Sequence, residues 1–178
     1  MAAKAIATFE RTLLSGNSPF DRYFFKGDRN AISVSAQRGF ELFRGGAGCT
    51  NCHLLEGSYA TFGNSKFFNT GVAATSFTTL EDQGRWKVTQ NEADRGAFRP
   101  PSLRNVALRA PYMHNGSLKS LYEVVRFYAD GGRANRWLSP QMLPPVPQNI
   151  DQQITDIVEF LYSLTGEIPE NAGPPENH

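Results

Sequence analysis

The pentapeptide Cys49-Thr50-Asn51-Cys52-His53 constrains this chain more than any other part of its sequence. Two thiols separated by two residues can add to the two vinyl groups of a haem, because the intervening backbone bridges the distance between those groups. The residue after the second cysteine then points an imidazole at the iron. The spacing therefore predicts one covalently bound haem c, attached through Cys49 and Cys52, with His53 as the proximal iron ligand.

Other uses of this motif fit the sequence less well. The chain has 2 cysteines, and a disulfide between them would close a very small loop and restrain little of the chain. A zinc site needs a fourth ligand, and the other histidines are His114 and the terminal His178. A thioredoxin-type cysteine pair would need a strand before it and a helix after it. Haem attachment is therefore the preferred interpretation.

Length and charge limit the expected partners. The 178 residues suffice for one domain with a proper core, and the formal net charge of +1 comes from scattered charges. Without a run of basic residues, nothing predicts nucleic-acid binding or attachment to a membrane surface. No stretch approaches the roughly 20 apolar residues of a membrane span. A cofactor and another protein are therefore the expected partners.

The cellular location is predicted from the motif. Bacteria attach haem to such motifs outside the cytoplasm, so a periplasmic location is expected. The first residues, from Met1 to Glu10, contain no continuous apolar region and no cleavage site. We therefore expect no signal peptide within the chain itself.

Apolar periodicity predicts an all-α domain with long irregular loops that pack on the haem. Helices are expected over residues 4–14, from Ser18 onward, and over 33–43, 120–130 and 150–164. Ser120 and Glu123 have the spacing of a capping box at the start of the fourth helix. From Gly57 to Pro101 no period is sustained, which predicts a loop with at most short helical turns. The helices over 33–43 and 150–164 are expected to cross near the haem.

The residue at the sixth coordination position of the iron decides what such a domain does. A methionine favours a plain electron carrier, a phenolic oxygen favours higher oxidation states, and an open position can react with peroxide. The candidates are Met113, His114, Tyr128 and Met142. Met142 lies just before the last helix, about where a small monohaem cytochrome c carries its ligand, so pattern alone favours it. Tyr128 lies on the apolar stripe of its helix, where a core tyrosine is the alternative interpretation.

Several further stretches occur together in one order that is typical of a known family. They are Ala5-Ile6-Ala7-Thr8-Phe9-Glu10-Arg11-Thr12-Leu13, Ser18-Pro19-Phe20-Asp21-Arg22-Tyr23, Phe68-Asn69-Thr70-Gly71, Asp94-Arg95-Gly96-Ala97-Phe98, Pro101-Ser102-Leu103-Arg104-Asn105-Val106, Ala110-Pro111-Tyr112-Met113-His114-Asn115-Gly116-Ser117 and Phe160-Leu161-Tyr162-Ser163-Leu164-Thr165-Gly166. With these stretches, the chain from Lys4 to Gly166 resembles the C-terminal half of the bacterial di-haem cytochrome c peroxidase family. It most resembles the branch that includes methylamine-utilisation protein G (MauG).

The resemblance implies a domain organisation. A cytochrome c-like helical domain over 33–166 would wrap around the haem, preceded by an inter-domain segment with short helices over 1–32. The remaining residues, 167–178, are rich in Pro, Asn and Glu and are expected to form a disordered tail.

The resemblance also implies a different sixth ligand. In the family this ligand lies fourteen positions after the histidine of the segment that here reads Tyr112-Met113-His114-Asn115-Gly116, and counting from His114 gives Tyr128. That position holds tyrosine in the MauG-like branch and methionine in other peroxidases, so the resemblance favours Tyr128 over Met142. His114 is then expected near the haem, with a hydrogen-bonded loop histidine as the alternative.

Two further sites follow from the resemblance. Arg104 and Asn105 are expected to bond a haem propionate or the loop backbone, because Arg suits carboxylate recognition, with a solvated surface arginine as the alternative. Family members hold a calcium ion between their two domains through backbone carbonyls that match Arg109 and Pro111. Arg109 replaces the family's usual threonine. Calcium is therefore expected only at an interface with a first domain that this chain lacks.

These expectations lead to two hypotheses about function. In the first, the chain is the second-haem half of a peroxide-using di-haem oxidoreductase, and its partner is another haem domain or an electron-donor protein. In the second, it is a stand-alone monohaem electron-transfer cytochrome c. If His53 and Tyr128 both bind the iron, hydrogen peroxide cannot reach the metal, so the isolated chain is expected to be a weak peroxidase. No catalytic residue is assigned.

Overall fold

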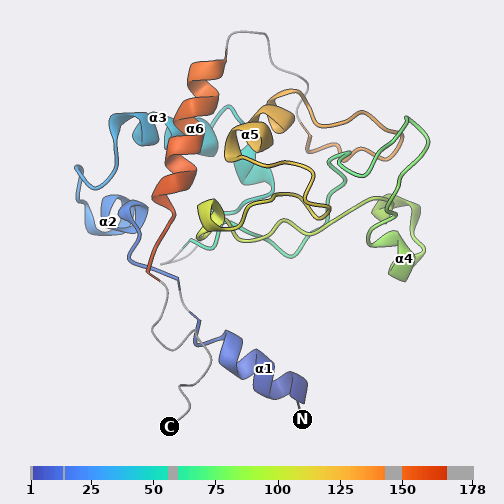
Figure 1. Ribbon diagram of the computed structural model, residues 1–178, viewed down its shortest axis with the longest axis horizontal. Helices are drawn as coiled ribbons and strands as arrows, with labels where there is room; N and C mark the ends of the chain where they lie inside the picture. Colours follow the sequence, from blue (N-terminus) through green and yellow to red (C-terminus); the bar gives the residue numbers. More distant parts are fainter. Residues whose placement is uncertain (1, 14, 56–59, 143–149, 168–178) are drawn as a thin grey trace.

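Helices make up the regular structure of the chain (Figure 1). The computed structural model describes residues 2–13, 15–55, 60–142 and 150–167. Its α-helices are α1 (Ala2–Glu10), α2 (Pro19–Lys26), α3 (Val34–Arg44), α4 (Trp86–Thr89), α5 (Leu121–Ala129) and α6 (Asp151–Ser163), and its 3-10 helices are η1 (Cys49–Asn51), η2 (Glu92–Asp94) and η3 (Val106–Leu108). Within those residues there are isolated β-bridges but no strand. The expected all-α class is therefore confirmed. None of the described helices is long and apolar enough to cross a membrane.

Side-chain caps fix where the helices begin. The Ser18 hydroxyl accepts from the Asp21 amide (3.1 Å) and the Asp21 carboxylate accepts from the Ser18 amide (3.0 Å), which together form a capping box at α2. At α5 the Ser120 hydroxyl caps the Glu123 amide (3.2 Å), as expected. The Glu123 carboxylate, however, accepts from the amide of Lys119 (2.5 Å) and not from that of Ser120. The return bond of the predicted capping box, from a backbone amide to Glu123, thus comes from the residue before Ser120.

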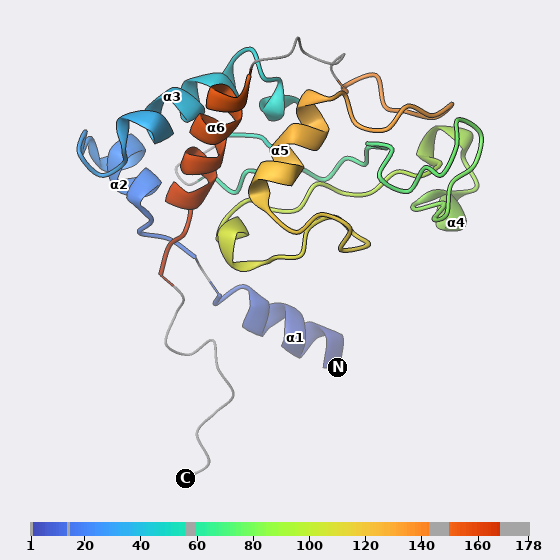
Figure 2. The same cartoon turned by 45° about the horizontal axis from the view of Figure 1, so that its top comes forward.

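The helices α3 and α6 pack directly on each other, and α5 lies beside α6 (Figures 1 and 2). Gly39 permits the close approach, since a β-carbon at this position would overlap the backbone carbonyl of Asp156. The Arg38 guanidinium donates to the Asp156 carboxylate through Nε (2.8 Å) and a terminal nitrogen (2.7 Å). Ser35 donates to the same carboxylate (2.5 Å). The pairing of these two helices therefore combines a backbone contact with a buried, fully bonded carboxylate.

An aromatic cluster fills the space between α2, α3 and α6. Its rings lie 4.9 to 6.0 Å apart between centroids, mostly edge to face, which is the favoured geometry for aromatic pairs. The members are Phe20, Phe40, Phe43, Phe62 and Phe160, all buried. We call α2, α3, α6 and this cluster the helical half of the molecule.

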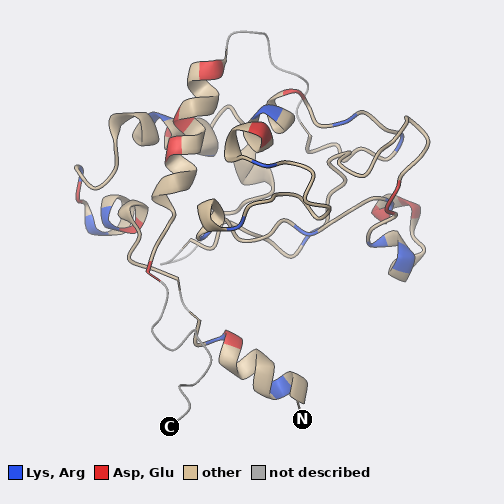
Figure 3. Cartoon of the chain, in the orientation of Figure 1, with Lys and Arg blue, Asp and Glu red and all other residues tan. Residues whose placement is uncertain are grey.

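Two loop segments form a second region, which we call the loop lobe and define as residues 64–99 and 131–142. It holds only α4 and η2 as helices, in agreement with the predicted loop. Backbone bonds join its two segments, from Arg133 to Thr70 (3.2 Å) and from Arg136 to Phe77 (2.8 Å). Basic and acidic residues occur together at its α4 end (Figure 3).

The N-terminal segment has two parts with different packing. In α2, Phe20 is fully buried in the aromatic cluster, whereas α1 has no buried residue and stands away from the body (Figure 1). The helix α1 ends at Glu10, earlier than the expected residue 14, and residue 14 lies outside the described residues. At the other end, Glu167 forms a β-bridge with Gly16, while the rest of the expected tail, 168–178, lies outside the described residues.

Candidate haem site

The Cys49 to His53 motif forms a compact turn directly after α3. Gly48 has a left-handed backbone (φ 67°) that begins η1, and the Cys49 carbonyl accepts from the amides of Cys52 (3.2 Å) and His53 (2.9 Å). Both cysteines are half-buried and are not bonded to each other. The turn therefore presents two free thiols and an imidazole from one short segment, as covalent haem attachment requires.

The environment of the two thiols disfavours other cysteine chemistry. Burial raises the pKa of the Cys49 thiol to about 12 and also raises the pKa of the Cys52 thiol. A redox-active or nucleophilic cysteine needs the opposite, a lowered pKa. Within the described part of the chain, no three His, Cys, Asp or Glu side chains gather as a metal cluster would require. The donor set thus fits a thioether-linked haem better than a zinc site or a thioredoxin-type pair.

His53 is oriented by a backbone carbonyl that sequence reasoning did not find. Its Nδ1 lies 2.7 Å from the Phe62 carbonyl oxygen. Because a carbonyl can only accept, Nδ1 carries the proton and Nε2 keeps its lone pair for a metal. Burial lowers the pKa of His53, with the carbonyls of Phe62 and Pro101 acting in the opposite direction. The bond to Phe62 therefore leaves Nε2 as the nitrogen that is free for a metal.

Tyr128 lies near the end of α5. Burial of the hydroxyl raises the pKa of Tyr128, and the neighbouring thiols of Cys52 and Cys49 raise it further. The residue as a whole keeps 40% of its surface exposed. Its role as the sixth ligand stays a prediction.

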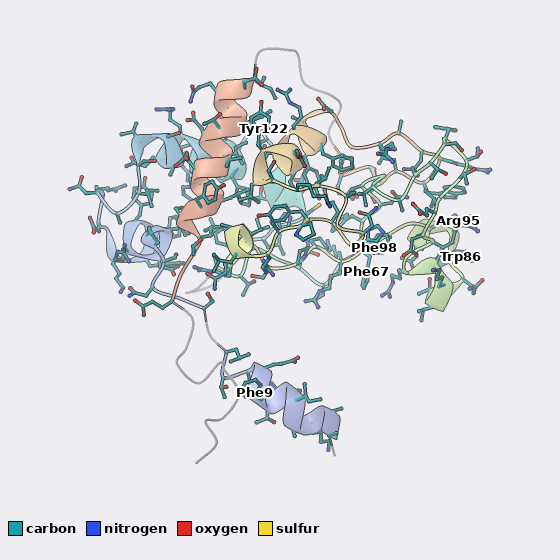
Figure 4. The ribbon with its side chains drawn as sticks, in the orientation of Figure 1. Phe9, Phe67, Trp86, Arg95, Phe98 and Tyr122 are labelled. Atoms are coloured by element: carbon teal, nitrogen blue, oxygen red, sulfur yellow. The ribbon has the colours of Figure 1, made fainter. Side chains whose placement is uncertain are left out.

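Two of the other candidates, Met142 and His114, contact residues of the loop lobe. The Met142 methyl group lies against Gly132, where it would be 2.8 Å from a β-carbon added to that glycine. The His114 ring stacks on Phe98 with 3.7 Å between centroids and 11° between planes; Figure 4 shows Phe98 at the edge of the loop lobe that faces the body. Burial lowers the pKa of His114, while Asp82 and Glu81 act in the opposite direction. Their roles as ligand and haem neighbour stay predictions.

Arg104 is engaged with protein groups. Its guanidinium forms an ion pair with Asp21 (2.7 Å) and its Nε donates to the Ala60 carbonyl (2.6 Å). The Asn105 amide donates to the Ser15 hydroxyl (2.5 Å), and its oxygen accepts from the Gly166 amide (2.7 Å). Arg104 thus donates to a backbone carbonyl, and Asn105 accepts from a backbone amide. Contact with a haem propionate stays untested.

The comparisons with known proteins identify the class of protein. A family model described as Cytochrome c matches residues 36–165. The chain therefore belongs to the cytochrome c family, in which haem c is covalently bound.

Individual relatives narrow this class. The chain is similar to the methylamine utilization protein MauG of Methylorubrum extorquens, with 41% identity over 165 residues that cover 92% of this chain and 43% of MauG. It is 38% identical over 166 residues to the cytochrome c peroxidase Ccp of Escherichia coli, covering 91% of this chain and 32% of that protein. A crystal structure of a MauG-like protein associated with microbial copper homeostasis matches with a TM-score of 0.70 and 31% identity, covering 84% of this chain and 52% of the other. The resemblance to MauG and the cytochrome c peroxidases is thus confirmed. The chain spans about half the length, or less, of the curated relatives that it matches.

Proposed function

We propose that this chain is the second-haem half of a peroxide-using di-haem oxidoreductase, and that it carries one haem c in which His53 and Tyr128 are the two axial ligands. The observation that carries this proposal is the turn that presents two free thiols together with an imidazole whose Nδ1 lies 2.7 Å from the Phe62 carbonyl. Tyr128 is assigned as the second ligand from its position on α5, fourteen residues after His114. The names of the relatives support the two-haem class over a stand-alone monohaem carrier.

The side chains divide the work at this site. Cys49 and Cys52 anchor the haem by thioether bonds, and His53 offers the lone pair of Nε2 because Nδ1 donates to Phe62. Tyr128 offers a phenolic oxygen, a hard donor that favours oxidised iron. When bound, the haem supplies one-electron redox chemistry. If His53 and Tyr128 both held the iron, Tyr128 would also exclude peroxide, and this half would exchange electrons while another haem reacts with peroxide.

This function requires partners outside the chain. A second haem domain reacts with hydrogen peroxide, and an electron-donor protein or that domain exchanges electrons with this one. The inter-domain segment 1–32 would connect the domains, 33–166 would form the haem domain, and the location would be the periplasm. A calcium ion would need an interface with the other domain, because it takes 6 to 8 oxygen ligands and the carbonyls of Arg109 and Pro111 supply only two.

Absorption spectra of the holoprotein test this proposal. The chain is expressed in a bacterial periplasm with a haem-maturation system, beside Tyr128→Phe and Met142→Leu. We expect covalent haem, a ferric spectrum that changes in Tyr128→Phe, and no change in Met142→Leu. Absence of covalent haem would refute the attachment site. A methionine-type near-infrared band that is lost only in Met142→Leu would make the chain an ordinary electron carrier.

A further inference from the structure

The segment next to His53 is fixed by side chains along almost its whole length. We call residues 60–64 the proximal strap. Four of its carbonyls accept hydrogen bonds from side chains: Ala60 from Arg104 (2.6 Å), Thr61 from Ser102 (2.6 Å), Phe62 from His53 (2.7 Å) and Asn64 from Arg99 (3.0 Å). The Asn64 amide in turn donates to the Cys52 carbonyl (2.6 Å). The strap has no helix or strand to hold it, so these side chains determine its path.

The centre of the strap has an unusual backbone. Phe62 has a left-handed conformation (φ 54°), which is rare for a bulky residue that is not glycine. Its ring is fully buried (0% exposed) and lies 5.5 Å from Phe20 and 5.8 Å from Phe43 between centroids. The surrounding packing therefore holds the residue in this conformation. The ring points into the aromatic cluster while the carbonyl faces His53.

Arg104 connects this strap to the helical half. Its guanidinium lies 5.5 Å from the centroid of the Phe62 ring and donates to the Ala60 carbonyl, two residues before the one that binds His53. The same guanidinium pairs with Asp21, which forms the capping box of α2 with Ser18, and both side chains are almost buried (11% and 12% exposed). Arg104 thus fixes the position of the strap relative to a helix end that is itself well anchored.

We propose that Arg104 is a positioning residue for the axial histidine: with Asp21 it sets the geometry of the strap, and thereby the strength of the hydrogen bond from His53 to Phe62. A stronger bond at Nδ1 gives the imidazole more anionic character, so Nε2 donates more strongly to iron and the ferric state is favoured. Loosening the strap weakens the bond and raises the reduction potential. The inference rests on the proposed function in one respect, namely that His53 binds the haem iron.

The test compares two conservative substitutions in the full-length holoprotein. Arg104→Lys keeps a positive charge beside Asp21, but a single ammonium lacks the fork that reaches both Asp21 and Ala60. Arg38→Lys is the matched control, since Arg38 also pairs with a buried carboxylate, Asp156, but makes no described contact with the strap. Both variants lose a forked ion pair, but only Arg104→Lys also removes a hydrogen bond to the strap.

Two measurements report on His53 directly. At a fixed applied potential we expect the ferric to ferrous ratio of Arg104→Lys to fall severalfold and up to about tenfold, where tenfold corresponds to ~59 mV for one electron. We also expect the Nδ1 proton of His53 to exchange faster with solvent in proton NMR spectra. Arg38→Lys should leave both quantities unchanged. Equal changes in the two variants, or no change in Arg104→Lys, would overturn the inference.

A milder variant keeps the test decisive if Arg104→Lys does not fold. Ser102→Ala removes the donor to the Thr61 carbonyl without leaving an unpaired buried charge, and it should shift the potential in the same direction by a smaller amount. An unchanged potential in Ser102→Ala would then overturn the inference. The proposed function fails separately, by absence of covalent haem or by a spectrum without histidine ligation in the unmodified protein.

Discussion

The helical half and the loop lobe are stabilised by different kinds of contact. In the helical half, buried phenylalanine rings pack between α2, α3 and α6. In the loop lobe, the buried side chain of Asn69 bonds to the Arg95 carbonyl, the Gly71 amide and the Asn135 side chain. The strap contacts both regions, because Phe62 packs on Phe20 and Arg99 donates to the Asn64 carbonyl. The centre of the helical half therefore depends mainly on apolar area, whereas the loop lobe adds to its buried apolar residues a set of hydrogen bonds whose loss leaves polar groups unpaired.

The largest expected effect is in the aromatic cluster. Phe160→Ala removes a fully buried ring that contacts the rings of Phe20, Phe40 and Phe43. We expect it to lower the free energy of unfolding of the holoprotein by about 3–5 kcal/mol in urea titrations. Phe77→Ala is the control, because Phe77 is 63% exposed in the loop lobe, and it should cost no more than about 0.5 kcal/mol. Equal losses in the two variants would contradict the division into regions.

The helices of the helical half could be predicted because apolar residues recur in its sequence with the helical period. The apolar positions of α3 and α6, such as Phe40 and Ile157, follow that period and are buried. Ser18 and Ser120 cap their helices as the sequence indicated. The loop lobe carries no such signal, because its order comes from residues far apart in sequence, such as Asn69 and Asn135.

The same contrast applies to the candidate site. The spacing of Cys49, Cys52 and His53 is local, so the motif can be read directly from the sequence. The Phe62 carbonyl that orients His53 is a backbone group. Its position depends on the left-handed backbone conformation of Phe62, which no residue pattern predicts. The pairing of Arg104 with Asp21 joins positions far apart in the chain, so composition and spacing could not reveal it either.

The second prediction concerns the loop lobe. Asn69→Ala removes a side chain that is 2% exposed and leaves the Gly71 amide and the Arg95 carbonyl without their partner. We expect a loss of about 1–3 kcal/mol, seen as faster hydrogen exchange in 64–99 and 131–142 with little change in α3 and α6.

The matched control for this prediction is Asn115→Ala. Asn115 is exposed and accepts only from the Ser117 amide (3.1 Å), so hydrogen exchange in the loop lobe should not change. If Asn69→Ala instead accelerated exchange throughout α3 and α6, the loop lobe and the helical half would unfold as one unit.

The third prediction concerns the buried carboxylate of the helical half. Hydrogen bonds from Arg38 lower the pKa of Asp156 from its ordinary 3.8 to about 2, against the effect of burial. Because the folded-state pKa is the lower one, this group stabilises the fold fully above about pH 3.8, and the contribution disappears as the pH falls through about 2. In urea titrations, the difference in free energy of unfolding between the unmodified protein and Asp156→Asn should therefore shrink by on the order of 1–2 kcal/mol between about pH 5 and pH 2. A constant difference across that range would mean that Asp156 does not carry this charge.

The smallest expected effect distinguishes two tryptophans of the loop lobe. Trp86 and Trp137 both face the Arg95 guanidinium, at 4.1 and 5.2 Å from their ring centroids, and Figure 4 shows Trp86 and Arg95 together beside α4. Trp137 Nε1 donates to the Glu92 carboxylate (3.2 Å), whereas the buried Nε1 of Trp86 has no hydrogen-bond partner among the described residues. Phenylalanine at either position keeps an aromatic ring but removes the N–H group. Only the change at Trp137 removes a hydrogen bond of the described structure. We therefore expect exchange in the loop lobe to be roughly two- to fivefold faster in Trp137→Phe than in Trp86→Phe. The reverse order would show that ring size, and not the bond to Glu92, determines how these tryptophans hold the lobe.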